Sequence, residues 1–540
     1  MASMSSISTA LSGLRAAQAG LAVTGHNVSN SGVLGYTRQQ GIQQDFSYLN
    51  RGSSPVGSLK MQVGIGTGVS QIRQLRNKFY DIAYREENGF GEYYARKYTA
   101  GEEINTIIGE MGSEYRAQEV ITDVWDAINE MSKNPGAIET RSLFIQSCVT
   151  LLDKMQDINK KLFEYQLNLN KQIEKEVKNI NDIVAQIGEL NQKIEEIEAD
   201  GSKANDLKDM RNNLLDELSG YIDIEVKETA VGNSGATRVD ILFQGNELLV
   251  SNIPQKIGLK YCNGEYPFVE PVFSSSDEIL PASDTSTPLF PNLASEDLGT
   301  TSTTTKGSLK GLLVARGEVV GNYTMPDSEI GNFSIPNIQK KIDTLIHEIV
   351  TKLNTASMSG KGLDGNYGIP IFVRKGVDDS NVGGGTMPGI IQGENSNDYN
   401  TLFTIDNIQI NPKLLEADGY NKLGFSKSGD KDDNTILVEL SKAWKEPIAN
   451  LEGASIDGYY KKIVTDYAVK VQEDREKLES KVGTIDLAQN KRLTISGVSL
   501  DEELSNMLKF QHAYNSAAKV VNVIDGMMDK IINGTGRVGI

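Results

Sequence analysis

The sequence is poor in the residues that most catalytic and metal sites require. Its 540 residues include only two cysteines, Cys148 and Cys262, and three histidines, which are His26, His347 and His512. Residues so few and so far apart exclude a disulfide framework and a zinc motif of the usual Cys/His spacing. No run of about 18 or more apolar residues is present, so the sequence predicts no helix that spans a membrane.

Positive charge is also scarce, because 72 acidic residues stand against 54 basic ones and give a formal net charge of −18. General binding to nucleic acid needs a basic surface against the phosphates and is therefore disfavoured. Gly64, Gly66 and Gly68 do not have the spacing of a dinucleotide-binding loop. The carboxylates of Glu195 and Glu196 lie on a charged helical face, and no G-x-S-x-G motif is present. We predict no catalytic residue, no cofactor and no metal.

Charge is almost absent from residues 1–37, where Arg15 is the only formally charged side chain. Apolar residues recur here at steps of three and four, and small residues occupy the other faces, which predicts a helix from about Ser3 to Asn30 packed against other helices. The segment lacks the basic start and compact apolar run of a cleaved signal peptide, so any export would use another route. The predicted packing seam of this helix consists of Ile7, Leu11, Leu14, Gln18, Leu21 and Val28.

A second amphipathic helix is predicted at the C-terminal end. Ser499 followed by Glu502 has the spacing of a capping box and predicts where this helix begins. Because the middle of the chain has apolar patterns of its own, we expect the two terminal helices to cover each other and their copies in neighbouring subunits. The seam predicted for the C-terminal helix consists of Leu504, Met507, Leu508, Gln511, Tyr514, Val521, Ile524 and Met528.

The middle of the chain alternates between long helical patterns and short β patterns. Pro135-Gly136 separates two long helices, the second of which carries a heptad pattern to about Ala199 and predicts an antiparallel coiled coil. Residues 239–243 and 248–250 are predicted to form a hairpin across Gly245-Asn246. The Ser- and Thr-rich stretch from Ser274 to Lys306 predicts an exposed linker or surface loop.

These patterns together predict a multidomain, mainly α protein with β insertions. It would have paired N- and C-terminal coiled-coil helices, a long-helix rod domain and mainly-β outer insertions. The predicted division is as follows: residues 1–45 with 495–540 form an inner terminal-helix domain, 46–220 with 307–356 and 427–494 the rod domain, 221–306 a β insertion with the linker, and 357–426 a second small β insertion.

Both ends of the chain resemble the signatures of flagellar rod, hook and hook-associated proteins, the axial family of the bacterial flagellum. The N-terminal likeness lies in Leu11-Ser12-Gly13-Leu14, Asn27-Val28-Ser29-Asn30 and Gly35-Tyr36-Thr37-Arg38, and the C-terminal one in Ser496 to Leu504 and Phe510-Gln511. The run Tyr36-Thr37-Arg38-Gln39 resembles hook-associated members rather than the hook protein, in which a Lys usually follows Gly-Tyr. The family-signature loop consists of Asn27, Asn30, Gly35, Tyr36, Thr37 and Arg38.

The resemblance implies a secreted structural protein that joins the flagellar hook to the filament, acts as a mechanical adapter and is needed for filament assembly. It implies export in an unfolded state by the flagellar type III route, without a cleaved signal. The implied partners are copies of the chain in a ring or helical layer, the hook protein below, the second junction protein (hook-associated protein 3) above, and an export chaperone on the C-terminal helix. No nucleic acid or membrane partner is expected, and no enzymatic activity.

Other functions stay open at this point. The chain could be an axial protein of the hook or rod type, a secreted coiled-coil adhesin or wall-acting enzyme, or a generic coiled-coil scaffold such as those of phage tails. An enzyme should show a cluster of polar catalytic groups, and the sequence shows none. A generic scaffold would explain the heptads but not two matched terminal signatures.

Overall fold

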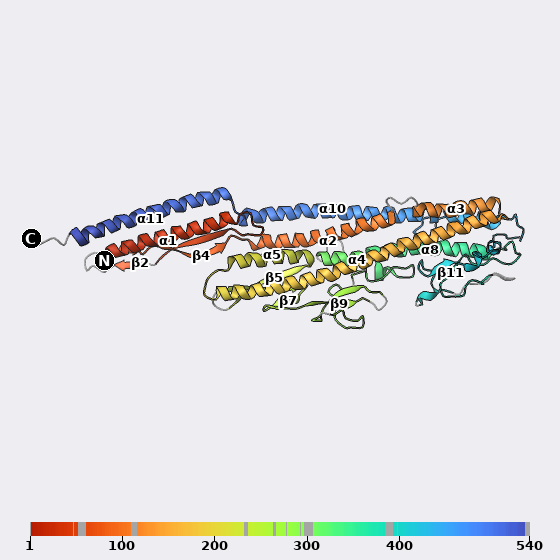
Figure 1. Ribbon diagram of the computed structural model, residues 1–540, viewed down its shortest axis with the longest axis horizontal. Coiled ribbons are helices and arrows are strands. Elements are labelled where there is room, and N and C mark those ends of the chain that lie inside the picture. The colour runs from red at the N-terminus through yellow and green to blue at the C-terminus, as the bar shows by residue number, and fades with distance from the viewer. Residues whose placement is uncertain are drawn as a thin grey trace, which may run out of the picture. The chain divides into compact units, whose positions relative to one another are not determined.

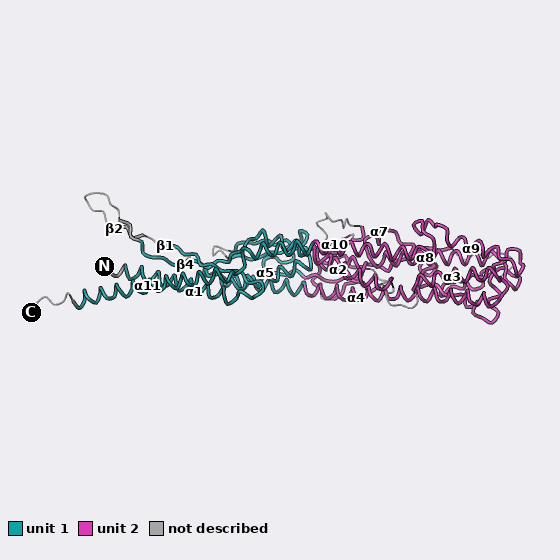
Figure 2. The backbone as a smooth tube through the Cα atoms, turned by 90° about the horizontal axis from the view of Figure 1, so that it is seen from above, with its two compact units in different colours: residues 1–89, 180–255, 481–540 teal, residues 90–179, 256–480 magenta. Residues whose placement is uncertain are grey.

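The computed structural model describes residues 2–46, 48–51, 61–109, 116–231, 236–262, 266–276, 278–291, 293–295, 306–383, 393–396 and 398–534. The chain forms two compact units, shown in Figure 2. Unit 1 comprises residues 1–89, 180–255 and 481–540, and unit 2 comprises residues 90–179 and 256–480. Long helices dominate both units, which confirms the predicted fold class. The four-part division predicted from the sequence stays a prediction.

In unit 1 the two terminal helices lie side by side (Figure 1). Helix α1 spans Ala2–Ser29 and helix α11 spans Leu500–Gly534. Both start within one residue of the predicted positions. A third helix of this unit, α5, spans Asn205–Tyr221 and follows a turn at Gly201, whose φ is +89°.

The described strands of unit 1 form three antiparallel sheets. Strand β1 (Gln39–Asp45) pairs with β4 (Thr67–Gln74), and β2 (Tyr48–Arg51) pairs with β3 (Met61–Gly64). The third sheet has the order β5-β6-β7-β8 and consists of Ile224–Val231, Ala236–Phe243, Asn246–Val250 and Ile253–Pro254.

The predicted hairpin is present as β6 and β7, but its turn lies one residue earlier than predicted. Gln244 and Gly245 occupy the two turn positions, with φ values of 49° and 83°. Positive φ at both positions matches the right-handed twist of the paired strands, and glycine adopts it without strain.

Unit 2 is built on helices, three of which also contribute residues to unit 1. The shared helices are α2 (Lys78–Gly109), α4 (Ile138–Glu198) and α10 (Ile456–Ser496). The others are α3 (Ala117–Lys133), α6 (Ser308–Arg316), α7 (Asp327–Ile330), α8 (Ser334–Met358) and α9 (Thr435–Lys445). The predicted break at Pro135-Gly136 separates α3 from α4, and large apolar side chains such as Phe144, Leu345 and Trp444 are fully buried.

Most described residues of Ser274–Lys306 are exposed or half-buried, as a surface loop requires, but a few of them are packed. The apolar residues Leu289, Phe290 and Leu293 of this stretch are buried. The stretch bridges to strands β9 (Ile257–Tyr261) and β10 (Val269–Phe273), which pair with each other. The high Ser and Thr content did not indicate this packing, because a few spaced apolar side chains are enough to cover a hairpin. Residues 277, 292 and 296–305 of the predicted linker lie outside the described residues.

The second predicted insertion contains less β structure than its composition indicated. Among its described residues, only β11 (Phe372–Arg374) and β12 (Ile408–Ile410) pair as strands. Most of the rest forms turns and short 3₁₀ helices at Tyr399–Thr401, Pro412–Leu414 and Gly419–Lys422. Buried asparagines hold these turns; Asn411 donates from Nδ2 to the carbonyl of Pro370 over 2.9 Å. Side chains that bond to nearby backbone favour turns over strand pairing.

Candidate functional site

The contact between α1 and α11 uses the small residues of α1 rather than its apolar seam. A Cβ built on Gly20 would lie 2.7 Å from ring atoms of Phe510, and one built on Gly13 would lie 4.0 Å from the Cβ of Ala517. Ala16 and Ala17 are buried on the same side of α1. Small residues let helices approach closely, and the Phe510 ring fills the space that Gly20 leaves open.

Replacing Gly20 by alanine should therefore destabilise unit 1, although alanine favours helices. We expect a loss of about 1–3 kcal/mol, typical of overpacking, because the new methyl group overlaps the ring of Phe510. Gly25→Ala is the matched control, since a Cβ there meets no atom within 4 Å, and it should stabilise the helix by roughly 0.5–1 kcal/mol. Urea unfolding followed by circular dichroism measures both. Equal effects of the two substitutions would contradict the close contact.

At the C-terminal end of α1, Asn27 organises a polar cluster that we call the terminal hub. Its side chain is 1% exposed. Nδ2 donates to the carbonyl of Gln39 (2.9 Å) and to the Glu503 carboxylate (3.1 Å). Oδ1 accepts from the backbone N–H of Gln39 (2.9 Å) and from the Tyr36 hydroxyl (2.8 Å). A buried amide with four satisfied bonds fixes the path of the chain from α1 into β1.

Arg38 joins the N-terminal segment to the start of α11. Its Nε donates to Oε1 of Glu503 over 2.8 Å, and its Nη2 lies 2.7 Å from the same oxygen. Nη1 lies 2.7 Å from Glu502. The Arg38 backbone N–H donates to the carbonyl of Ser496, 2.9 Å away. Glu502, which the sequence placed at the start of this helix, and its neighbour Glu503 therefore both bind an arginine of the signature loop.

The hub also reaches helix α5. The backbone N–H of Thr37 donates to Asp209 over 3.1 Å, and Nε2 of Gln39 donates to Asp206 over 3.1 Å. Burial raises the pKa of Asp209, an effect that the bond from Thr37 opposes. Burial also raises the pKa of Tyr36, and the nearby acids add to the increase.

The two remaining signature residues shape the turn that enters the hub. Gly35 has a φ of +77°, and a Cβ on it would lie 2.0 Å from the side chain of Asn213, so another residue there would have a strained backbone and would displace that side chain. Asn30 donates from Nδ2 to the carbonyl of His26 over 2.9 Å and so closes the end of α1. All six residues of the predicted loop thus lie in one connected turn, and Asn27, Tyr36, Thr37 and Arg38 meet in the hub.

The residues of the predicted seam differ in how far they are buried within the chain. On α1 none of its residues is buried: Leu11 and Gln18 are exposed, and Ile7, Leu14, Leu21 and Val28 are half-buried. On α11, Ile524 is buried, and Met507, Tyr514, Val521 and Met528 are half-buried. Leu504, Leu508 and Gln511 are exposed. Their role as contacts between subunits stays a prediction.

Sequence reasoning missed the part of the hub that α5 supplies. Asn205, Asp209 and Arg211 of this helix are buried. The signal was the spacing of Asn205, Asp209 and Asn213, which puts polar side chains on one helical face at steps of four. Such a face is ordinarily solvated, so the pattern alone does not show that it is buried.

Known proteins match the chain along its length. Residues 102–372, half of the chain, match the family model described as the flagellar hook-associated protein FlgK helical domain. The chain belongs to the FlgK family of flagellar hook-associated proteins. Residues 489–534, which include Glu502, Glu503 and all of α11, match the C-terminal region of flagellar basal body rod FlgEFG proteins. The second match covers the segment in which the sequence showed the C-terminal axial signature.

Full-length relatives and a solved structure agree with this membership. Flagellar hook-associated protein 1 of Bacillus subtilis is 26% identical, over 98% of both chains. The protein of that name from Escherichia coli is 24% identical, over 98% of this FlgK-family chain and 99% of its own. The flagellar hook junction protein FlgK from Burkholderia pseudomallei has the same fold, with a TM-score of 0.56 and 12% identity over 77% of this chain and 100% of its own.

Proposed function

We propose that this chain is the structural protein that joins the hook to the filament of the bacterial flagellum and allows filament assembly. Membership of the FlgK family carries the proposal. The paired terminal helices support it, because they bring both family signatures together and leave apolar side chains such as Leu11, Leu504 and Leu508 exposed on the isolated chain. Exposed apolar stripes on helices that already pack against each other favour contacts with further copies.

The other functions fit these observations less well. Full-length relatives named as hook-associated protein 1 do not favour a hook or rod protein, and they do not favour an adhesin or a wall-acting enzyme. Within the part of the chain that the structure describes, no group of three or more His, Cys, Asp and Glu side chains could hold a metal ion. None of the described helices is long and apolar enough to cross a membrane. The proposed role is mechanical and involves no chemical step.

Several finer features belong to the same proposal. Copies of the chain would form a ring or short helical layer through heterologous contacts, with the hook protein below and the second junction protein above. Before assembly, the exposed stripe at Leu504 and Leu508 would need a cover, which an export chaperone supplies. The chain would reach the outside of the cell by the flagellar type III route.

Deleting the gene tests the function directly. The deletion strain should keep its hooks, lack filaments and release unassembled flagellin into the medium. Electron microscopy of the cells and an immunoblot of the medium measure these outcomes, and expression of the full chain from a plasmid should restore filaments. Normal filaments on the hooks of the deletion strain would refute the assignment.

A further inference from the structure

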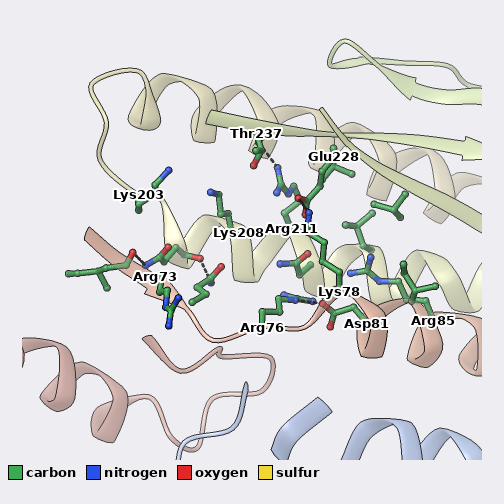
Figure 3. A pocket seen from close by; sticks show the side chains of 18 of the residues that line it. Arg73, Arg76, Lys78, Asp81, Arg85, Lys203, Lys208, Arg211, Glu228 and Thr237 are labelled. Carbon is green, nitrogen blue, oxygen red and sulfur yellow. Dashed lines mark hydrogen bonds and ion pairs between the residues drawn. The ribbon is translucent and has the colours of Figure 1, made fainter. Parts of the chain in front are cut away.

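Unit 1 contains a pocket whose lining is strongly cationic, although the chain as a whole is acidic. The pocket has a volume of about 470 Å³ and is shown in Figure 3. The segment from β4 to α2, the helix α5 and the strands β5 and β6 line it. Its basic side chains are Arg73, Arg76, Lys78, Arg85, Lys203, Lys208 and Arg211, and its acidic ones are Asp81 and Glu228.

Three arginines at the back of this pocket are only partly satisfied. Arg211 is 2% exposed; its Nη1 donates to Oδ1 of Asn191 (2.8 Å), whereas its Nε has no acceptor among the described residues. Arg76 and Arg85 bind carboxylates through Nε, yet the Nη2 atom of each is buried without an acceptor in the described structure. Buried guanidinium groups normally use most of their donors, so the charge of these three arginines is only partly compensated by the described residues.

The nearby carboxylates are too few to balance these arginines. Asp81 lies 2.5 Å from Nε of Arg76 and also 3.1 Å from Arg492. Asp216 lies 2.7 Å from Nε of Arg85 and also 2.6 Å from Arg492. Arg76, Arg85 and Arg492 therefore share two carboxylates.

The same imbalance affects Arg211. Burial lowers its pKa to about 10, and the positive charges of Arg76 and Arg85 contribute to the decrease. Glu228 and Glu198 oppose it, but each is already paired, Glu228 with Lys78 and Glu198 with Lys208. The lining of the pocket thus carries an excess of positive charge, which favours an anion.

We propose that this pocket binds a polyvalent phosphate-class anion. Guanidinium groups present paired donors that match the oxygens of phosphate, and lysines at the rim add point charges. The volume falls within the range of about 300–1,000 Å³ that small-molecule sites occupy. A bound anion would hold β4, α5 and the β5–β6 pair together through one set of contacts. The site adjoins the terminal hub, because Gln74 of its lining donates to Asp209 over 2.8 Å. The proposal does not depend on the proposed junction role.

Inorganic pyrophosphate is the probe for this site. Titration calorimetry on the full chain should show saturable binding, and pyrophosphate should raise the melting temperature more than sulfate does at equal ionic strength. Arg73→Gln with Lys203→Gln removes two rim charges; Arg73 is exposed and Lys203 half-buried, so the chain should still fold. We expect this double variant to bind pyrophosphate roughly tenfold more weakly or worse, as the loss of charge-assisted bonds predicts.

Lys193→Gln with Lys227→Gln is the matched control, because both lysines belong to unit 1, are exposed and do not line the pocket. It should bind pyrophosphate as the unaltered chain does. Equal weakening in both double variants would show diffuse attraction to the surface and overturn the proposal. So would the absence of binding at millimolar pyrophosphate. A third outcome would also overturn it: pyrophosphate binds neither the unaltered chain nor the variants, and only Arg73→Gln with Lys203→Gln changes self-association. The pocket would then bind acidic side chains of a second copy instead.

Discussion

A Leu504→Lys variant is expected to leave hooks without filaments, although the isolated chain folds normally. Leu504 is 50% exposed on the first turn of α11, so a lysine there should cost the monomer little. In the proposed junction the same position is covered by a neighbouring copy. An unpaired charge would then be buried in every subunit contact, at a cost of about 3–5 kcal/mol for each. A ring of repeated contacts multiplies this loss.

The measurement is complementation of the deletion strain, with filaments counted by electron microscopy. Circular dichroism of the purified variant should show unchanged helix content. Leu14→Asp tests the seam of α1 in the same way, since Leu14 is only half-buried within the chain and lies away from the small-residue face that contacts α11.

Ser505→Lys is the matched control for Leu504→Lys. It adds the same charge one residue later, at an exposed position outside the predicted seam. Filaments should form normally with this variant. If Leu504→Lys also supported filaments of normal number and length, Leu504 would not lie in a subunit contact and the predicted seam would be wrong at that end.

Helix positions could be predicted from the sequence because heptad spacing and turn residues act locally. The starts of α1 and α11, the break at Pro135-Gly136 and the β6–β7 hairpin all follow from such local patterns. The faces of the helices were harder to predict. A heptad seam shows which residues should be buried but not which helix buries them. The close approach of Gly20 to Phe510 shows that the small residues of α1 face α11.

Long-range polar contacts could not be predicted at all. Glu503 is the residue after Glu502 of the capping-box pattern, and its charge suits the start of a helix. Nothing near it in the sequence indicates that it binds Arg38 and Asn27, more than 460 residues earlier. The buried Asp209 of α5 is a similar case. The family signatures located both ends of the hub, but only the fold shows that they form one cluster.

Arg38→Met should be the most damaging single substitution for the stability of unit 1. Glu503 is 2% exposed, and without the guanidinium its carboxylate would keep only the weaker bond from Asn27. Removing one partner of a buried ion pair costs about 3–5 kcal/mol. The hub would then no longer tie α1 to the start of α11, and the two terminal helices should separate at lower denaturant concentration.

The two tryptophans allow the effect to be assigned to one unit. Trp125 and Trp444 both belong to unit 2, so their fluorescence follows that unit, whereas circular dichroism follows the helices of both. In urea, Arg38→Met should shift the circular dichroism transition of unit 1 and leave the tryptophan transition unchanged. Arg15→Met, which removes an exposed arginine of α1, should change neither by more than about 0.5 kcal/mol.

A double-mutant cycle separates the ion pair from the loss of packing. Glu503→Gln keeps an acceptor for Asn27 but removes the buried charge, so adding it to Arg38→Met should recover a large part of the lost stability. The coupling energy should lie in the range of about 0.5–3 kcal/mol expected for residues in direct contact. Additive effects of the two substitutions would show that Arg38 acts through its packing, and that the charge on Glu503 does not hold the terminal segments together.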